Sequence, residues 1–139
     1  MADETLLGFD FGVKRIGVAV GQTVTGTASA LTVLPAKRQA PDWLGIEKLI
    51  KEWQPNALVV GLCLDRYGQD NEVTPRIRKF CRQLNGRYQL PVYQHDETLS
   101  TFEAKQLLFD DVNVSARKLM AVQDALAAQR ILESWLAEH

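Results

Sequence analysis

The sequence has little cysteine, no long apolar run and no excess of either charge. Its two cysteines, Cys63 and Cys81, fall in different expected elements without metal-ligand spacing, so neither a disulfide nor a zinc site is expected. No apolar run reaches the ~18 residues that cross a bilayer, and the acidic start MADETLL does not resemble a secretory signal. These absences indicate a bacterial-type cytoplasm, or an equivalent reducing compartment, and no membrane partner.

The length and the balance of residues are those of one globular domain that spans residues 1–139. A net charge of −1 neither requires nor excludes a nucleic-acid partner, because the distribution of charge matters more than its sum. Basic residues cluster at Lys14–Arg15 and in the segment TPRIRKFCRQLNGR, whereas acids collect in other segments. The basic clusters are therefore the places where a polyanion would bind.

The hydrophobic pattern predicts an α/β fold. Strands are expected at residues 5–11, 16–21, 27–34, 57–62 and within PVYQHDE, and helices at 42–53, from Thr74 to Gly86, from a capping box at Ser100 and Glu103 to Phe109, and from Ser115 onward. Gly12 is expected to give the first hairpin an unusual backbone conformation, and residues 35–39 are expected to form a loop. The order predicts three antiparallel strands, then two parallel strands, in a mixed sheet with helices on both faces.

Asp10 lies within an otherwise apolar strand, LLGFDF. Burial of an unpaired carboxylate costs several kcal/mol, so Asp10 needs a compensating partner. A second acid, Asp124, falls on the apolar stripe of the last helix at about 100° per residue, with Ala128, Ile131 and Trp135 within about 40° of it. Gln129 and Glu133 point the other way. The pattern therefore directs Asp124 toward the sheet.

Asp96 and Glu97 lie where the strand in PVYQHDE ends, and strand alternation lets one of the two face a given side. Three converging acids would repel one another unless a cation lay between them. Oxygen ligands favour Mg²⁺ or Mn²⁺. Two such ions about 4 Å apart would activate a water molecule and stabilise the leaving oxygen of a phosphodiester. The alternatives are that the inward Asp124 is a structural hydrogen-bonding residue and that Asp10 bonds turn amides.

Four segments, FDFGVKRIGVAVG, VVGLCLDRYG, HDETLST and QDALAAQRIL, resemble in order and spacing the motifs of the YqgF family. The resemblance covers nearly the whole chain, residues 6–132. It implies a ribonuclease-H-like fold and a hydrolase of phosphodiester bonds, either a nuclease that matures the 5′ end of pre-16S ribosomal RNA or a Holliday-junction resolvase. It also implies association with structured RNA or branched DNA and with the ribosome, in a monomer or weak homodimer.

The same resemblance assigns Asp10, Glu97 and Asp124 as the catalytic, metal-binding triad, with Asp96 a weaker candidate. Two departures bear on substrate contacts. Thr98 replaces the arginine that is common in the family, and Cys63-Leu64-Asp65 replaces a proline-containing segment.

Basic side chains provide candidate nucleic-acid contacts, which the sequence places at the first hairpin and on the helix that starts near Thr74: Lys14, Arg15, Arg76, Arg78, Lys79 and Arg82. The alternative is that the helix has a merely solvated outer face. Tyr67 is either a surface aromatic or a platform for an unpaired base.

Two other function classes are weighed against a nuclease. The segment DFGVKRIGVAVG also looks like the first phosphate motif of actin-like sugar kinases and chaperone ATPases, but those enzymes need two domains and a second phosphate motif. A non-catalytic ribosome-assembly module would suit the Thr98 departure, yet such a surface gains nothing from three acids near phosphates. The sequence therefore favours the nuclease.

Overall fold

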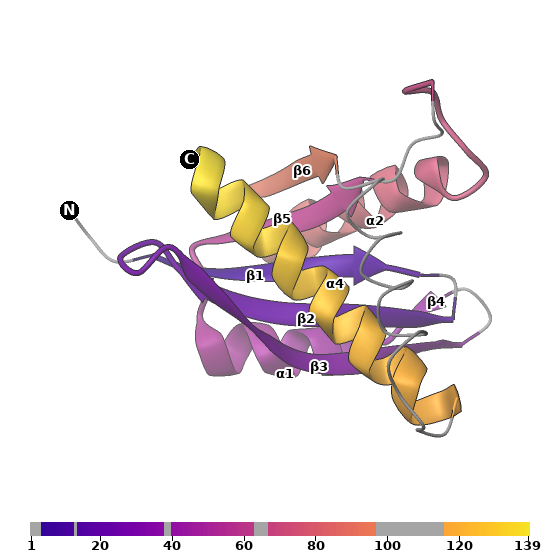
Figure 1. The fold of residues 1–139 in the computed structure, drawn as a ribbon, viewed down its shortest axis with the longest axis horizontal. Helices are drawn as coiled ribbons and strands as arrows, with labels where there is room; N and C mark the ends of the chain where they lie inside the picture. Colours follow the sequence, from indigo (N-terminus) through magenta and orange to yellow (C-terminus); the bar gives the residue numbers. More distant parts are fainter. Residues whose placement is uncertain (1–3, 13, 38–39, 63–66, 97–115) are drawn as a thin grey trace.

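The computed structural model describes residues 4–12, 14–37, 40–62, 67–96 and 116–139, with side chains in the last segment from Gln123 onward. These residues form a six-stranded sheet and three helices (Figure 1). The elements are β1 (Thr5–Phe11), β2 (Arg15–Gln22), β3 (Thr27–Lys37), β4 (Ala40–Pro41), α1 (Trp43–Trp53), β5 (Ala57–Leu62), α2 (Thr74–Tyr88), β6 (Val92–Asp96) and α4 (Ala116–Glu138).

The sheet has the strand order β4-β3-β2-β1-β5-β6. Strands β1, β2 and β3 pair antiparallel, and β5 and β6 continue the sheet parallel to β1. Helices α1 and α2 lie on one face, and α4 crosses the other face diagonally (Figure 1). The predicted mixed sheet with helices on both faces is therefore confirmed.

Strand alternation divides the hydrophobic core in two. Leu7, Phe9 and Leu58 pack against α1 and α2, whereas Leu6 and Val59 pack against α4. Because β1 and β5 are buried on both faces, their sequences are almost continuously apolar.

The α4 face of the sheet is built from glycines that let the helix come close. A Cβ on Gly17 would lie 1.9 Å from the carbonyl oxygen of Asp124. A Cβ on Gly8, Gly21 or Gly61 would lie under 3.0 Å from side-chain atoms of α4, at Leu132 or Ile131. We call Gly8, Gly17, Gly21 and Gly61 the glycine track.

Some expected boundaries at the start of the chain were wrong. Strand β3 continues to Lys37 through the expected loop, because Pro35 pairs with Arg15 and the short strand β4 extends the sheet beyond Ala36. Gly12 has no positive φ. Glycine is needed there because a Cβ would lie 2.5 Å from the carbonyl oxygen of Arg15.

Both ends of α2 also differ from expectation. Thr74 is the first residue of the helix rather than its N-cap, and the Asn71 side chain accepts hydrogen bonds from the backbone N–H groups of Val73 and Thr74. Gly86 does not end the helix, which continues to Tyr88 and is followed by Gln89 at φ 54°. The observed end is therefore a left-handed glutamine.

Strand β6 was expected to be mostly buried, but it is an edge strand with largely exposed side chains. Gln129 was expected to point away from the sheet, yet its Oε1 accepts a hydrogen bond from the backbone N–H of Ala30 in β3. The expected capping box at Ser100 and Glu103, and its helix, lie outside the described residues. Among the helices that are described, none has the length and apolar character to cross a membrane.

Candidate active site

Asp10 is 7% exposed and lies near the end of β1. It shares the α4 face with Leu6 and Gly8, which precede it at intervals of two residues. Its partner in the antiparallel ladder is Gly17 of β2. Since directly opposed residues of an antiparallel pair project to the same face, the carboxylate of Asp10 points toward α4.

Asp124 approaches the same place from α4. The residue is 8% exposed, and its carbonyl oxygen occupies the space that a Cβ of Gly17 would need. Gly17 is therefore the common neighbour of the two acids, by strand pairing with Asp10 and by close packing with Asp124. The expectation that Asp124 points toward the sheet is confirmed, and two buried acids share one face of the sheet.

Arg15 is a direct partner of Asp124. Its Nε donates a hydrogen bond to Oδ2 of Asp124 over 2.7 Å, and the Arg15 side chain is 37% exposed. A charge-assisted bond of this kind offsets part of the cost of burying the carboxylate. The predicted contact of Arg15 with nucleic acid stays a prediction, while the structure adds a role in holding Asp124.

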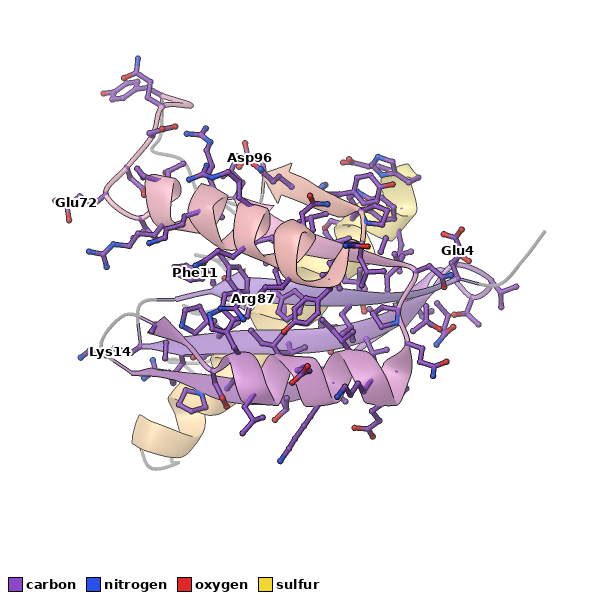
Figure 2. The ribbon with its side chains drawn as sticks, turned by 180° about the vertical axis from the view of Figure 1, so that it is seen from behind. Glu4, Phe11, Lys14, Glu72, Arg87 and Asp96 are labelled. Carbon is purple, nitrogen blue, oxygen red and sulfur yellow. The ribbon has the colours of Figure 1, made fainter. Side chains whose placement is uncertain are left out.

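Of the two acids expected at the end of β6, the structure describes Asp96. Asp96 pairs with Leu62, is exposed, and lies on the α2 side of the sheet with Val92 (Figure 2). The opposite, α4 side of β6 carries Tyr93, which stacks on Trp135 at a centroid distance of 5.1 Å. Asp96 therefore does not face Asp10. Glu97, the predicted third acid, lies outside the described residues.

The two buried acids on this face of the sheet offer the type of ligand atom that a hard divalent cation prefers. Asp10 and Asp124 supply carboxylate oxygens, the ligands that Mg²⁺ and Mn²⁺ prefer. Among the described residues no group of three or more His, Cys, Asp and Glu could hold a metal ion. A cation bound by the two described acids would take its other ligands from elsewhere, and it would compete with Arg15 for Asp124.

The basic residues of α2 divide between two sides of the helix. Arg76 and Lys79 line a cavity beside β1 with Phe11 and Phe80, whereas Arg78 forms an ion pair with Asp70. Part of the predicted basic surface therefore has an acidic partner within the chain. The nucleic-acid contacts predicted for these residues stay predictions.

The remaining predicted contacts are exposed. Arg82 is exposed on α2, and Lys14 is exposed at the hairpin between β1 and β2 (Figure 2). Tyr67 is 79% exposed. Sequence reasoning missed the pairing of Arg15 with Asp124 and the closeness of Gly17 to α4. The available signal for the second was Gly17 itself, a glycine inside the apolar strand RIGVAV.

Comparison with known proteins shows the family. Residues 4–138 match the family model described as RuvX, Holliday junction resolvase. The chain belongs to this family. A relative from Pseudomonas paraeruginosa, named "Putative pre-16S rRNA nuclease", is 53% identical over 134 residues, which are 96% of this chain and 92% of the relative. A relative of the same name from Yersinia pestis is 51% identical over 138 residues, 99% of this chain and 98% of its own.

Solved structures share the fold of this RuvX-family chain. The fowlpox virus resolvase in complex with Holliday junction DNA has a TM-score of 0.57 at 10% identity and covers 96% of this chain and 97% of its own. The RuvC of T. thermophilus in complex with a Holliday junction substrate has a TM-score of 0.55 at 14% identity, over 97% of this chain and 94% of its own. The ribonuclease-H-like fold is confirmed.

Membership of the RuvX family, together with the names of its relatives, confirms the expected class of enzyme: a nuclease that hydrolyses phosphodiester bonds. Nucleic acid is accordingly its partner. Nucleases of this fold generally depend on divalent metal ions.

Proposed function

We propose that the protein is a divalent-metal-dependent nuclease that matures the 5′ end of pre-16S ribosomal RNA in the bacterial cytoplasm. The observation that carries the proposal is the meeting of Asp10 and Asp124 at Gly17 on one face of the sheet. A divalent cation bound between two buried carboxylates would offset part of their desolvation cost, in addition to what Arg15 provides at Asp124. The names of relatives more than 50% identical to the chain support the RNA substrate.

In this proposal Asp10, Asp124 and Glu97 bind two Mg²⁺ or Mn²⁺ ions. In β6, Tyr93 stacks on Trp135 on the α4 side, whereas Asp96 lies on the other side. Because side chains alternate along a strand, this favours Glu97 over Asp96 as the third ligand. The bound ions would activate the attacking water and stabilise the leaving oxygen. The carboxylates position the ions, and Arg15 holds Asp124 in place until they bind.

The proposed phosphate contacts are made by lysine and arginine side chains from the hairpin after Asp10 and from α2. Lys14 and Arg15 lie at the hairpin that follows Asp10, and Arg76, Arg78, Lys79 and Arg82 lie on α2. Such contacts position a substrate without reading its sequence. Selection of the cleavage site would then depend on the shape of the RNA and on association with the ribosome.

A second candidate is cleavage of four-way DNA junctions, which the description of the family model favours. Symmetric cleavage of a junction needs two active sites related by a twofold axis, whereas RNA maturation needs one. We propose a monomer or a weak homodimer. A protein that sediments only as a monomer at the assay concentration would argue against junction cleavage.

The experiment incubates a 5′-extended pre-16S RNA and a four-way DNA junction with the wild type, Asp10→Asn and Asp124→Asn in Mg²⁺ or Mn²⁺. Loss of a charged metal ligand should lower kcat by about two orders of magnitude or more, since such a ligand contributes several kcal/mol. Glu97→Gln and Asp96→Asn form a matched pair, and loss of activity is expected in the first alone. Wild-type turnover by Asp10→Asn would refute the proposal, and intact nucleic-acid binding without any cleavage would indicate a binding module.

A further inference from the structure

A second feature of this molecule lies on the sheet face opposite Asp10. A cavity of about 380 Å³ opens between α2, β4 and the end of β1. Its apolar wall includes Phe11, Trp43 and Phe80, and its polar rim consists of Arg76, Lys79 and Gln83. We call these six residues the β1–α2 groove. Ligand pockets have volumes of roughly 300–1,000 Å³, so the space suits a single small ligand unit.

The rim of the groove carries two positively charged side chains. Arg76 and Lys79 lie three residues apart and so project from one side of α2. Within the described part of the chain neither has an ion-pair partner, whereas their neighbour Arg78 is paired with Asp70. The described lining residues include no acid. Charge complementarity therefore favours an anion at the rim.

The wall of the groove is an aromatic cluster held in place by the core. Phe80 is 1% exposed, and its ring lies 5.1 Å from that of Phe11 and 5.7 Å from that of Trp43, centroid to centroid. The guanidinium of Arg87 lies 4.1 Å from the Trp43 ring centroid, which fixes that ring further. Phe11 and Trp43 are only half-buried, so their accessible parts provide the aromatic surface for contact with a nucleobase.

The groove and the two buried acids lie at the same end of the sheet. Phe11 directly follows Asp10 in β1, so their side chains point to opposite faces of one strand end. Figure 2 views the molecule from the α1 and α2 side, and there Phe11 lies beside α2 with Lys14 at the same end. A nucleic-acid strand that passes around this edge would reach both places.

We propose that the β1–α2 groove binds one nucleotide of the substrate strand, next to the bond that is cleaved. Arg76 and Lys79 bind its phosphate, Phe11 and Trp43 contact its base, and the amide of Gln83 bonds to the edge of that base. The assignment rests on the proposed function in that it takes the substrate to be a nucleic acid cut near Asp10. Its ligand chemistry, a phosphate and an aromatic base linked through a sugar, is shared by a free nucleoside monophosphate.

The test compares Arg76→Gln/Lys79→Gln with the control Lys48→Gln/Lys51→Gln, which removes the same charge from exposed positions of α1. Both are made in the full chain with Asp10→Asn, so that bound RNA stays intact. Affinity for a 5′-extended pre-16S RNA fragment and its salt dependence are measured. Affinity for adenosine monophosphate, adenosine and inorganic phosphate is followed through the Trp43 indole resonance.

We expect the groove variant to bind the RNA at least about tenfold more weakly and with a log–log salt slope smaller by roughly two, because two phosphate contacts are lost. The control should bind like its parent. Equal RNA affinities of the two double variants would overturn the proposal. If adenosine monophosphate alone then depended on Arg76 and Lys79, the groove would be a site for free nucleotides instead.

Cleavage kinetics separate this inference from the proposed function. With Asp10 intact, Arg76→Gln/Lys79→Gln should raise KM and leave kcat for saturating RNA within about threefold, since interactions equal in ground and transition state act on KM. Cleavage by Asp10→Asn would defeat the proposed metal site without touching the groove. A fall in kcat alone, with KM and binding unchanged, would overturn the groove assignment.

Discussion

Arg15 Nε donates a hydrogen bond to Asp124 Oδ2 over 2.7 Å, and this bond joins residues 109 positions apart in the chain. It links the first turn of the sheet to the helix that covers it. Since Asp124 is also a proposed metal ligand, the same carboxylate would serve both the Arg15 guanidinium and a metal ion from solution. Occupation of the site must therefore involve competition between the two.

Arg15→Gln should bind Mn²⁺ more tightly than the wild type, by about threefold to tenfold, because Asp124 loses its built-in cation. Titration of free Mn²⁺ by electron paramagnetic resonance measures this without nucleic acid. Lys14→Gln is the matched control, because it removes the same charge from the neighbouring exposed residue. Equal tightening in both variants would show a general charge effect rather than competition at Asp124.

Gly17→Ala should lower the free energy of unfolding by about 3 kcal/mol or more and should impair cleavage. The added methyl group would meet the backbone carbonyl of Asp124, which cannot turn aside as a side chain can. Gly86→Ala is the control: nothing lies within 4 Å of the added Cβ, and stability should rise by about 0.5–1 kcal/mol. Urea unfolding of both variants gives the comparison, and a neutral Gly17→Ala would contradict the close packing.

Asn71→Ala should destabilise the protein by about 1–2 kcal/mol, because its Oδ1 accepts from the backbone N–H groups of Val73 and Thr74 at 2.8 and 3.0 Å. The neighbouring Glu72 is exposed, so Glu72→Ala should change the stability by less than about 0.5 kcal/mol. Thermal unfolding measures both. A matching loss in the two variants would show that the capping bonds contribute nothing.

Burial raises the pKa of the Cys81 thiol from 9.0 to about 11. The unfolded chain then loses this proton at lower pH than the folded chain, so the stability tied to it is complete below pH 9 and declines as pH rises toward 11. Relative to Cys81→Val, the wild type should lose about 2 kcal/mol between pH 8 and pH 10.5. Parallel stability curves for the two proteins would contradict this.

The sequence was most informative where a local pattern matched the final environment. The 3.6-residue stripe of α1 and the continuous apolar runs of β1 and β5 predicted their elements because one or both faces are buried. The phase of the last helix was correct at Asp124, whose inward direction followed from spacing alone, but not at Gln129, which bonds to β3. Both described acids of the site were thus predictable as buried, though not as neighbours of Gly17.

The predictions from sequence failed where contacts with residues distant in the chain determine the structure. The extension of β3 through Pro35 depends on pairing with β2 and β4, and the exposure of β6 depends on its place at the sheet edge. The α2 end moved past Gly86 because Gln89 adopts the left-handed conformation instead. The bond between Arg15 and Asp124 has no local signature, since any exposed arginine in the hairpin carries the same sequence pattern.

The glycine track constrains the number of residues in α4 between Asp124 and Leu132, because both ends of this stretch pack against glycines of the sheet. One residue inserted between Asp124 and Ile131 would rotate everything beyond it by about 100° and shift it by about 1.5 Å. Either Asp124 would then move away from Gly17, or Leu132 and Ile131 would lose their contacts with Gly8 and Gly61. Insertions and deletions should therefore be rare within this stretch across the family and common after Glu138, a pattern that an alignment of its members can show.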